Sequence, residues 1–180
     1  EVVHGIPTDR VLEEGQIVGV DCGAEKDGYF GDHARTFAVG TISEEKQQLM
    51  DITRESLLRG IAEAKPGNYV SDIGYAIQSF VEQYGYSVVR ELVGHGIGTK
   101  LHEEPQVPNY GEPKQGYRLR EGMCIAIEPM INMGVKEIKT DADGWTIRTL
   151  DGEASAHFEH TIAITANGPV ILSEGEKVLG

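Results

Sequence analysis

Two observations predict an α+β fold with a mainly antiparallel sheet. The first is the order of the expected elements: β structure over residues 16–40, two helices between residues 43 and 85, and then further strand-like segments up to residue 173. Because helices do not alternate with strands in long parallel repeats, a dinucleotide-binding fold is not expected. The second is a strand pattern that recurs in both halves of the chain, which indicates a duplicated unit with a site at the shared seam.

The β structure of the first half is predicted to fold back on itself. Apolar, strand-like segments run over residues 16–23 and 29–40, with a turn at Lys26-Asp27-Gly28 between them. Asp21 and Asp32 lie eleven positions apart, on either side of this turn. If the two segments form a hairpin, both carboxylates converge on one side of the sheet.

Two helices are expected in the middle of the chain. Ser43 can cap the first, Glu44 and Glu45 suit the positive end of its dipole, and Lys65-Pro66-Gly67 follows its end near Ala64. For the second helix, Ser71 is the expected cap and Gly85 the expected stop. Its apolar residues form one stripe at helical spacing, made of Ile73, Ala76, Ile77, Phe80, Val81 and Tyr84. We expect both helices to cover the sheet, and we assign them no chemistry.

The repeated pattern ends in an acid each time. Residues 12–21 read LEEGQIVGVD and residues 119–128 read LREGMCIAIE. A weaker repeat relates Asp32, in GDHARTFAVG, to Glu159, in FEHTIAIT. Gly19 and Ala126 precede the first pair of acids by two residues, so a small side chain shares the face of each acid.

These acids, together with a histidine, predict a metal site. The candidate ligands are Asp21, Asp32, His95, Glu128 and Glu159. An unpaired charge beside apolar strands is costly, and adjacent carboxylates repel unless one is protonated or a cation lies between them. Two divalent cations would balance four carboxylates. Taken singly, the acids also have ordinary explanations, such as a turn cap for Asp32 or solvent exposure for Glu159.

His95 lies in a glycine-rich stretch, GHGIG at residues 94–98, which we interpret as part of a turn. The flanking glycines allow close approach of the backbone, and His102 follows seven residues later, where it can face the same pocket. The stretch is neither a zinc-protease HExxH, because position 106 is Gln106, nor a nucleotide-binding GxGxxG, because no helical run follows it.

The amino-acid composition and the absence of some motifs narrow the range of possible functions. Asp and Glu number 29 against 16 Lys and Arg, for a net charge of −13, which argues against binding to nucleic-acid backbones. There is no apolar run long enough to span a membrane and no signal peptide. Cys22 and Cys124, both in apolar segments, are expected to be reduced core thiols in a reducing compartment. No GxSxG occurs, so a serine nucleophile is not indicated.

The motifs resemble those of type I methionine aminopeptidase along essentially the whole chain. The matching segments are HGIP (4–7), VDCGAEKDGYFGD (20–32), GHGIGTKLHEEPQVPNYG (94–111), IEPM (127–130) and DGW…AHFEHTIAIT (143–165). The resemblance implies the pseudo-twofold "pita-bread" architecture, with residues 1–180 as one catalytic domain. The resemblance also implies that the family's N-terminal stretch before HGIP, which contributes to the methionine pocket, is not among residues 1–180.

The resemblance also implies roles for individual residues. Asp32 and Glu159 would bridge two metal ions, Asp21 would complete one site, and His95 and Glu128 the other. A water shared by the ions would attack the scissile carbonyl. Glu128 would shuttle the proton, His102 would donate a hydrogen bond to the developing oxyanion, and His4 would contact the substrate.

Substrate specificity is expected from Trp145 and from Leu101. Trp145 would be an aromatic wall of the methionine pocket, although an ordinary core tryptophan is an equal alternative. The resemblance implies Co, Mn, Fe(II) or Zn as the two divalent ions, and a peptide or nascent-chain N-terminus as the partner. It implies a cytoplasmic monomer that associates transiently with ribosomes and binds neither nucleic acid nor membrane.

Three alternatives remain at this point. An Xaa-Pro aminopeptidase or prolidase shares the fold and the ligand set, but HGIP and the compact EEPQVPNYG loop argue against it. A catalytically silent binding homologue would usually have lost ligands, and all five are present. A two-metal phosphoesterase would usually carry more histidines and a basic phosphate clamp.

Overall fold

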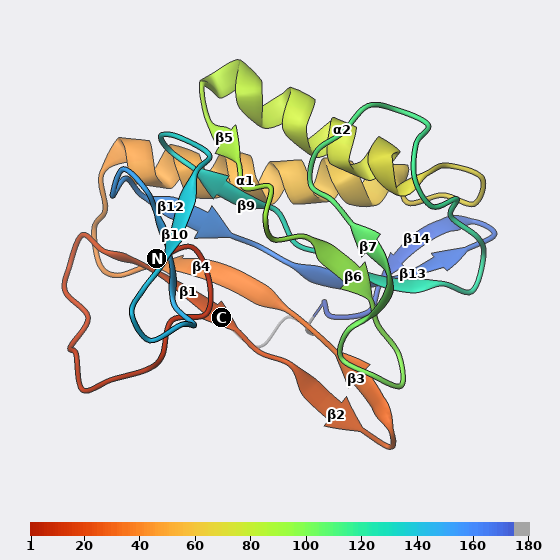
Figure 1. Ribbon diagram of the computed structural model, residues 1–180, viewed down its shortest axis with the longest axis horizontal. Coiled ribbons are helices and arrows are strands. Elements are labelled where there is room, and N and C mark those ends of the chain that lie inside the picture. The colour runs from red at the N-terminus through yellow and green to blue at the C-terminus, as the bar shows by residue number, and fades with distance from the viewer. Residues whose placement is uncertain (175–180) are drawn as a thin grey trace.

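Two helices pack together on one side of a layer of antiparallel strands, in a computed structural model that describes residues 1–174 (Figure 1). Strands β1 to β4 form the first half: Ile17–Asp21, Ala24–Lys26, Tyr29–Gly31 and Ala34–Ala38. After the helices come β5 to β9: Ser87–Val88, Gly94–Gly96, Glu103–Val107, Cys124–Ile127 and Met130–Asn132. The last are β10 to β14: Ile138–Thr140, Ile147–Thr149, Ser155–His157, His160–Thr165 and Gly168–Ile171. The predicted α+β class is confirmed.

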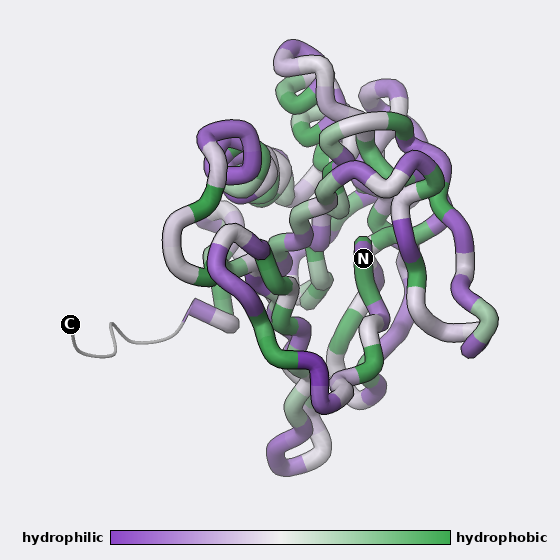
Figure 2. The backbone as a smooth tube through the Cα atoms, turned by 90° about the vertical axis from the view of Figure 1, so that its left-hand side faces the viewer, coloured by the Kyte–Doolittle hydropathy of each residue, from purple (hydrophilic) through white to green (hydrophobic). Residues whose placement is uncertain are grey.

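Every described strand pair is antiparallel. The largest sheet has the order β14-β13-β8-β6-β7, and a second sheet has the order β12-β9-β5. The first half contributes the pair β1-β4 and the hairpin β2-β3, which closes through Asp27-Gly28, both at positive φ. This hairpin projects away from the helices and carries a hydrophilic tip (Figures 1 and 2). The predicted turn between Asp21 and Asp32 is therefore confirmed.

The first helix, α1 (Glu44–Glu63), begins as predicted. The Ser43 side chain accepts a hydrogen bond from the Lys46 backbone N–H at 3.4 Å, and Glu44 and Glu45 occupy the first turn. The cap satisfies one of the N–H groups that a helix start leaves without a partner.

The second helix, α2 (Val70–Val81), begins two residues earlier than expected. The prediction that Ser71 caps it is wrong, because Ser71 lies inside the helix and its Oγ accepts a hydrogen bond from the Gln115 N–H. The Asp72 carboxylate instead accepts from the N–H of Tyr69, the residue before the helix. A 3₁₀ turn, η1 (Glu82–Tyr84), follows, and Gly85, at φ 78°, ends the helical segment as predicted.

The hydrophobic core lies between the helices and the strands. Leu57 of α1, Ile73 and Ile77 of α2, and Ile125 and Ile162 of the large sheet are fully or almost fully buried in one cluster. The two helices therefore cover the sheet, as the apolar stripe predicted, but its last member, Tyr84, lies in η1 and is 45% exposed. No helix among residues 1–174 combines the length and apolarity needed to cross a bilayer.

Two local expectations fail. The stretch GHGIG is not a turn, because residues 94–96 form β6, which pairs with both β7 and β8. Cys22 is not a core thiol, because it follows β1 directly and is exposed. β1 belongs to a two-stranded sheet that leaves one face uncovered. Cys124 is partly buried.

Candidate metal centre

Strand ends bring the four predicted carboxylates together. Asp21 is the last residue of β1, and Glu128 follows β8 directly; Asp32 lies just before β4, and Glu159 just before β13. The repeat seen in the sequence is thus a structural repeat: in each half, one acid lies at the end of a strand and the other lies just before the strand that pairs with it.

Hydrogen bonds join the two halves at this point. The Glu159 backbone N–H donates to the Ala34 carbonyl at 2.8 Å. Asp32 donates its N–H to Thr161 Oγ1 and accepts at its carbonyl from the same hydroxyl, both at 2.8 Å. These bonds fix the backbone of both acids at the seam between the halves.

His95 reaches the acids from the middle of the large sheet. A Cβ on Gly94 would clash with the Ala126 carbonyl, and one on Gly96 with the Glu104 carbonyl. The flanking glycines are therefore required for close strand approach, as predicted. Ala126 lies directly opposite His95 in the β6-β8 register, so a small residue faces the imidazole.

The hydrogen bonding of His95 fixes its tautomer. Its Nδ1 lies 2.9 Å from the Gly96 carbonyl oxygen, which can only accept, so Nδ1 donates. In the neutral ring Nε2 then carries the lone pair, and it lies 3.5 Å from Glu128 Oε1 and 3.9 Å from Asp32 Oδ2. A lone pair that faces two carboxylates suits a cation placed between them.

Three groups of side chains have ligand atoms within 4.8 Å of one another. One is Asp21, Asp32 and Glu159, a second is His95, Glu128 and Glu159, and a third is Asp32, His95 and His102. The first two groups share Glu159 and together contain all five predicted ligands.

Electrostatics favour a cation at this position. Glu159 is 1% exposed, and its Oε1 has no hydrogen-bond partner. Burial, reinforced by the charges of Glu128, Asp32 and Asp21, raises the pKa of Glu159 to about 10. Burial also raises the pKa of Asp21, with a smaller opposing effect from His157. Oxygen and imidazole ligands of this kind suit divalent ions such as Mn or Zn, so the donor set fits a metal.

A cavity of about 820 Å³ opens onto the acids. It is lined by Asp21, His95 and Glu128 at one end and by His4, His102 and Trp145 elsewhere. His102 is exposed and meets the His95 ring edge-on, with 4.3 Å between centroids. Leu101 is not among the residues that line the cavity; its methyl groups instead lie beside Gly23.

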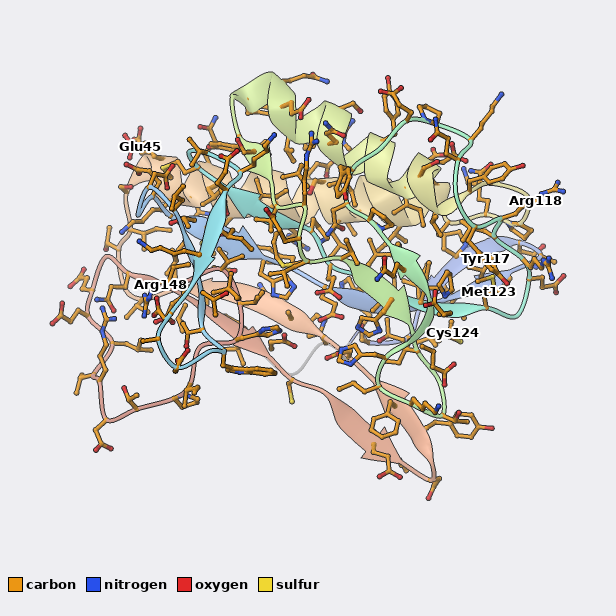
Figure 3. The ribbon with its side chains drawn as sticks, viewed as in Figure 1. Glu45, Tyr117, Arg118, Met123, Cys124 and Arg148 are labelled. Carbon is orange, nitrogen blue, oxygen red and sulfur yellow. The ribbon has the colours of Figure 1, made fainter. Side chains whose placement is uncertain are left out.

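Trp145 and His4 form a stacked pair at the cavity, with ring centroids 4.6 Å apart and planes 18° from parallel. Trp145 is 55% exposed, so it is not a core tryptophan. The N-terminal segment that carries His4 is tied to β11 by backbone bonds between residues 2–3 and Ile147. Arg148, labelled in Figure 3, adds contacts to Glu1 at 2.8 Å and to Asp141 at 2.5 Å.

Sequence reasoning missed His157. It is 4% exposed, and its Nε2 lies 3.5 Å from Glu128 Oε2. The available signal was its place two residues before Glu159, since residues two apart along an extended chain share a face.

The comparisons with known proteins agree with this geometry. Residues 1–166 match the profile of Metallopeptidase family M24. The chain is 55% identical to methionine aminopeptidase 1 of Bacillus subtilis (strain 168) over 173 residues, which are 96% of this chain and 70% of that protein. A methionine aminopeptidase of Clostridium acetobutylicum is 53% identical, with the same shares covered.

Among solved structures, a methionine aminopeptidase is more similar to this chain than a prolidase is. The crystal structure of methionine aminopeptidase from Thermotoga maritima superposes with a TM-score of 0.95 at 49% identity, covering 97% of this chain and 71% of that one. Prolidase from Pyrococcus furiosus superposes with a TM-score of 0.77 at 30% identity, covering 97% and 46%. The fold is therefore the pita-bread fold common to both, and the chain belongs to metallopeptidase family M24, on its methionine aminopeptidase branch.

Proposed function

We propose that this chain, as a methionine aminopeptidase, removes the N-terminal methionine of polypeptides with two divalent cations held by its five predicted ligands. The observation that supports it most directly is the sharing of Glu159 by two candidate ligand groups. Identity of 55% to a methionine aminopeptidase of which the chain covers 70% supports the choice of substrate.

In the proposed centre, Asp32 and Glu159 would be shared by both ions, Asp21 would complete one site, and His95 with Glu128 would complete the other. The ions, drawn from Co, Mn, Fe(II) and Zn according to availability, would supply Lewis-acid activation of water and of the scissile carbonyl. The partnerless Oε1 of Glu159 and the lone pair of His95 Nε2 are the atoms whose surroundings argue for this assignment.

The remaining roles follow from position. Glu128 lines the cavity beside His95, where its carboxylate can take a proton and pass it to the leaving amine. His102 is exposed at the same cavity and is placed to donate a hydrogen bond to the oxyanion that forms at the carbonyl. His4 lines the same cavity and would contact the substrate there, with Trp145 stacked against it.

For specificity, Trp145 supplies an aromatic surface for the methionine thioether. Leu101 contributes from behind Gly23 rather than from the cavity wall, so its effect on methionine binding is indirect. The substrate is a polypeptide N-terminus, and we propose that the chain meets it as a cytoplasmic monomer, with transient ribosome association.

A combined measurement tests this function. Metal content by elemental analysis and hydrolysis of Met-Ala-Ser are measured on the same preparations, with an Ala-Pro peptide as the comparison substrate. We expect activity on Met-Ala-Ser that rises with metal loading up to two ions per chain. Preference for the Ala-Pro peptide would instead establish the Xaa-Pro aminopeptidase alternative, and metal binding without hydrolysis of either peptide would establish the silent homologue.

A further inference from the structure

His157 is a buried imidazole that the proposed reaction does not use. It belongs to β12 and is 4% exposed. Among residues 1–174, four buried side-chain atoms have no hydrogen-bond partner, and one of these is His157 Nε2. Buried polar groups are nearly always satisfied, so an exception next to a functional site calls for a physical reason.

The nearest charged group to this atom belongs to the proposed centre. His157 Nε2 lies 3.5 Å from Glu128 Oε2, while the other oxygen of the same carboxylate, Oε1, lies 3.5 Å from His95 Nε2. Glu128 is therefore held between two histidines, one facing each oxygen.

The two histidines must act differently on this carboxylate. His95 donates through Nδ1 to the Gly96 carbonyl, so its Nε2 offers a lone pair. A lone pair and a carboxylate oxygen attract each other only through a cation. His157 Nε2 faces the second oxygen, and a protonated Nε2 can donate to it directly.

The backbone holds His157 rigidly in this position. Its N–H donates to Thr36 Oγ1, and the same hydroxyl donates back to the His157 carbonyl, both at 2.9 Å. On its other side, His157 pairs with Met130 of β9. The backbone of His157 is therefore fixed at the seam between the halves, which places its side chain beside Glu128.

The geometry points to His157 as a positioning residue: its Nε2–H donates to Glu128 Oε2, which leaves Glu128 Oε1 aimed at the cation site beside His95. This inference rests on the proposed metal centre. The present separation is longer than the ~2.9 Å of an ordinary N–H···O bond, and rotation of the Glu128 side chain closes it. His157 is absent from the groups of possible metal ligands found among residues 1–174, which separates its role from that of His95.

The first test reads the tautomers in the metal-free protein by long-range ¹H–¹⁵N correlation spectra. We expect the proton on Nε2 of His157 and on Nδ1 of His95. A His157 ring protonated only at Nδ1 would overturn the proposal, because its Nε2 could then only accept. This measurement does not depend on peptide hydrolysis, so it separates this inference from the proposed function.

The second test measures binding of Mn²⁺ alone by calorimetry, in the full chain and two variants. His157→Leu removes the donor, and we expect Mn²⁺ affinity to fall about 10–100-fold, the usual effect of losing a group that orients a ligand. His157→Gln retains an N–H donor, and we expect affinity within about threefold of wild type. His160→Gln is the matched control, because that ring turns away to Ser173 Oγ at 2.9 Å.

Each contrary outcome has a distinct meaning. Unchanged Mn²⁺ affinity in His157→Leu would show that His157 does not position Glu128. An equal loss in His157→Gln and His157→Leu, with circular dichroism confirming both folds, would show that the ring itself binds the ion. If His157→Leu does not fold, the Gln variant and the tautomer spectra still decide the question.

Discussion

The two halves of the molecule carry the same pattern of strands and acids in different surroundings. In the first half, β1 and β4 form a two-stranded sheet whose outer face leaves Val20 and Phe37 about half exposed. In the second half, β8 and β13 lie inside the five-stranded sheet, and Ile125, Ala126 and Ile127 are completely buried.

This difference in depth is visible in one pair of equivalent acids, because Asp21 is exposed whereas its equivalent Glu128 is partly buried. Asp32 and its equivalent Glu159 are both buried, and the pKa of Glu159 is raised to about 10. A repeated motif therefore supplies chemically similar ligands, while burial determines how strongly each depends on a cation. The most buried acid, Glu159, is shared by two candidate ligand groups, and so is Asp32.

The largest effect is expected from the buried, bridging acids. Glu159→Gln or Asp32→Asn should reduce turnover of Met-Ala-Ser to below about a tenth of wild type and lower metal occupancy, because both are proposed to bridge the two ions. Elemental analysis and steady-state kinetics measure both quantities.

Asp21→Asn is the comparison from the exposed half. It should retain one of the two ions, whereas Glu159→Gln should lose affinity for both. Equal loss of metal from Asp21→Asn and Glu159→Gln would mean that the two halves contribute equally to metal binding. Turnover above about a tenth of wild type in Glu159→Gln at saturating metal would remove its bridging assignment.

His102→Ala separates chemistry from metal binding. We expect kcat to fall about 10²–10³-fold, the scale of one lost oxyanion donor, with metal content unchanged. His102 also belongs to one candidate ligand group, with Asp32 and His95. Loss of metal from this variant would therefore mean that His102 is a metal ligand.

Trp145→Ala addresses specificity at the mouth of the cavity. A thioether–aromatic contact contributes about 0.3–1.5 kcal/mol, so KM for Met-Ala-Ser should rise roughly 2- to 10-fold. Because Trp145 is 55% exposed, the melting temperature should change little. A large fall in melting temperature with an unchanged KM would contradict a binding role.

The smallest expected effect is on stability without metal. The folded protein holds a proton on Glu159 up to about pH 10, whereas the unfolded chain releases it near pH 4.5, so the folded state binds more protons between these values. Stability of the chelated protein should therefore fall as pH rises through this range.

Thermal melts of the chelated protein at pH 6 and pH 9 would measure this trend, and we expect a lower melting temperature at pH 9. Glu159→Gln should flatten the trend, and Asp21→Asn should leave most of it. If the pH dependence of stability persists in Glu159→Gln, it originates from a group other than Glu159.

The sequence alone determined the fold class, the first helix and the five candidate ligands. These follow from local patterns: apolar stripes at helical spacing, a serine cap, and acids at repeated places beside apolar strands. The same local logic misplaced the start of α2 and took β6 for a turn. Ser71 bonds instead to Gln115, and Gly94–Gly96 pairs with β7 and β8, and both are contacts between distant segments.

Only the tertiary structure decided depth and partners. It buried Glu159 beneath the cavity, exposed Cys22 and Trp145, and set His157 against Glu128. The reason is physical: a residue's exposure and its charged neighbours depend on which strands cover it, and pairing across the seam joins segments more than a hundred residues apart. A pattern of residues can specify a strand, but the burial and the charged neighbours of the residue at the end of that strand depend on the rest of the fold.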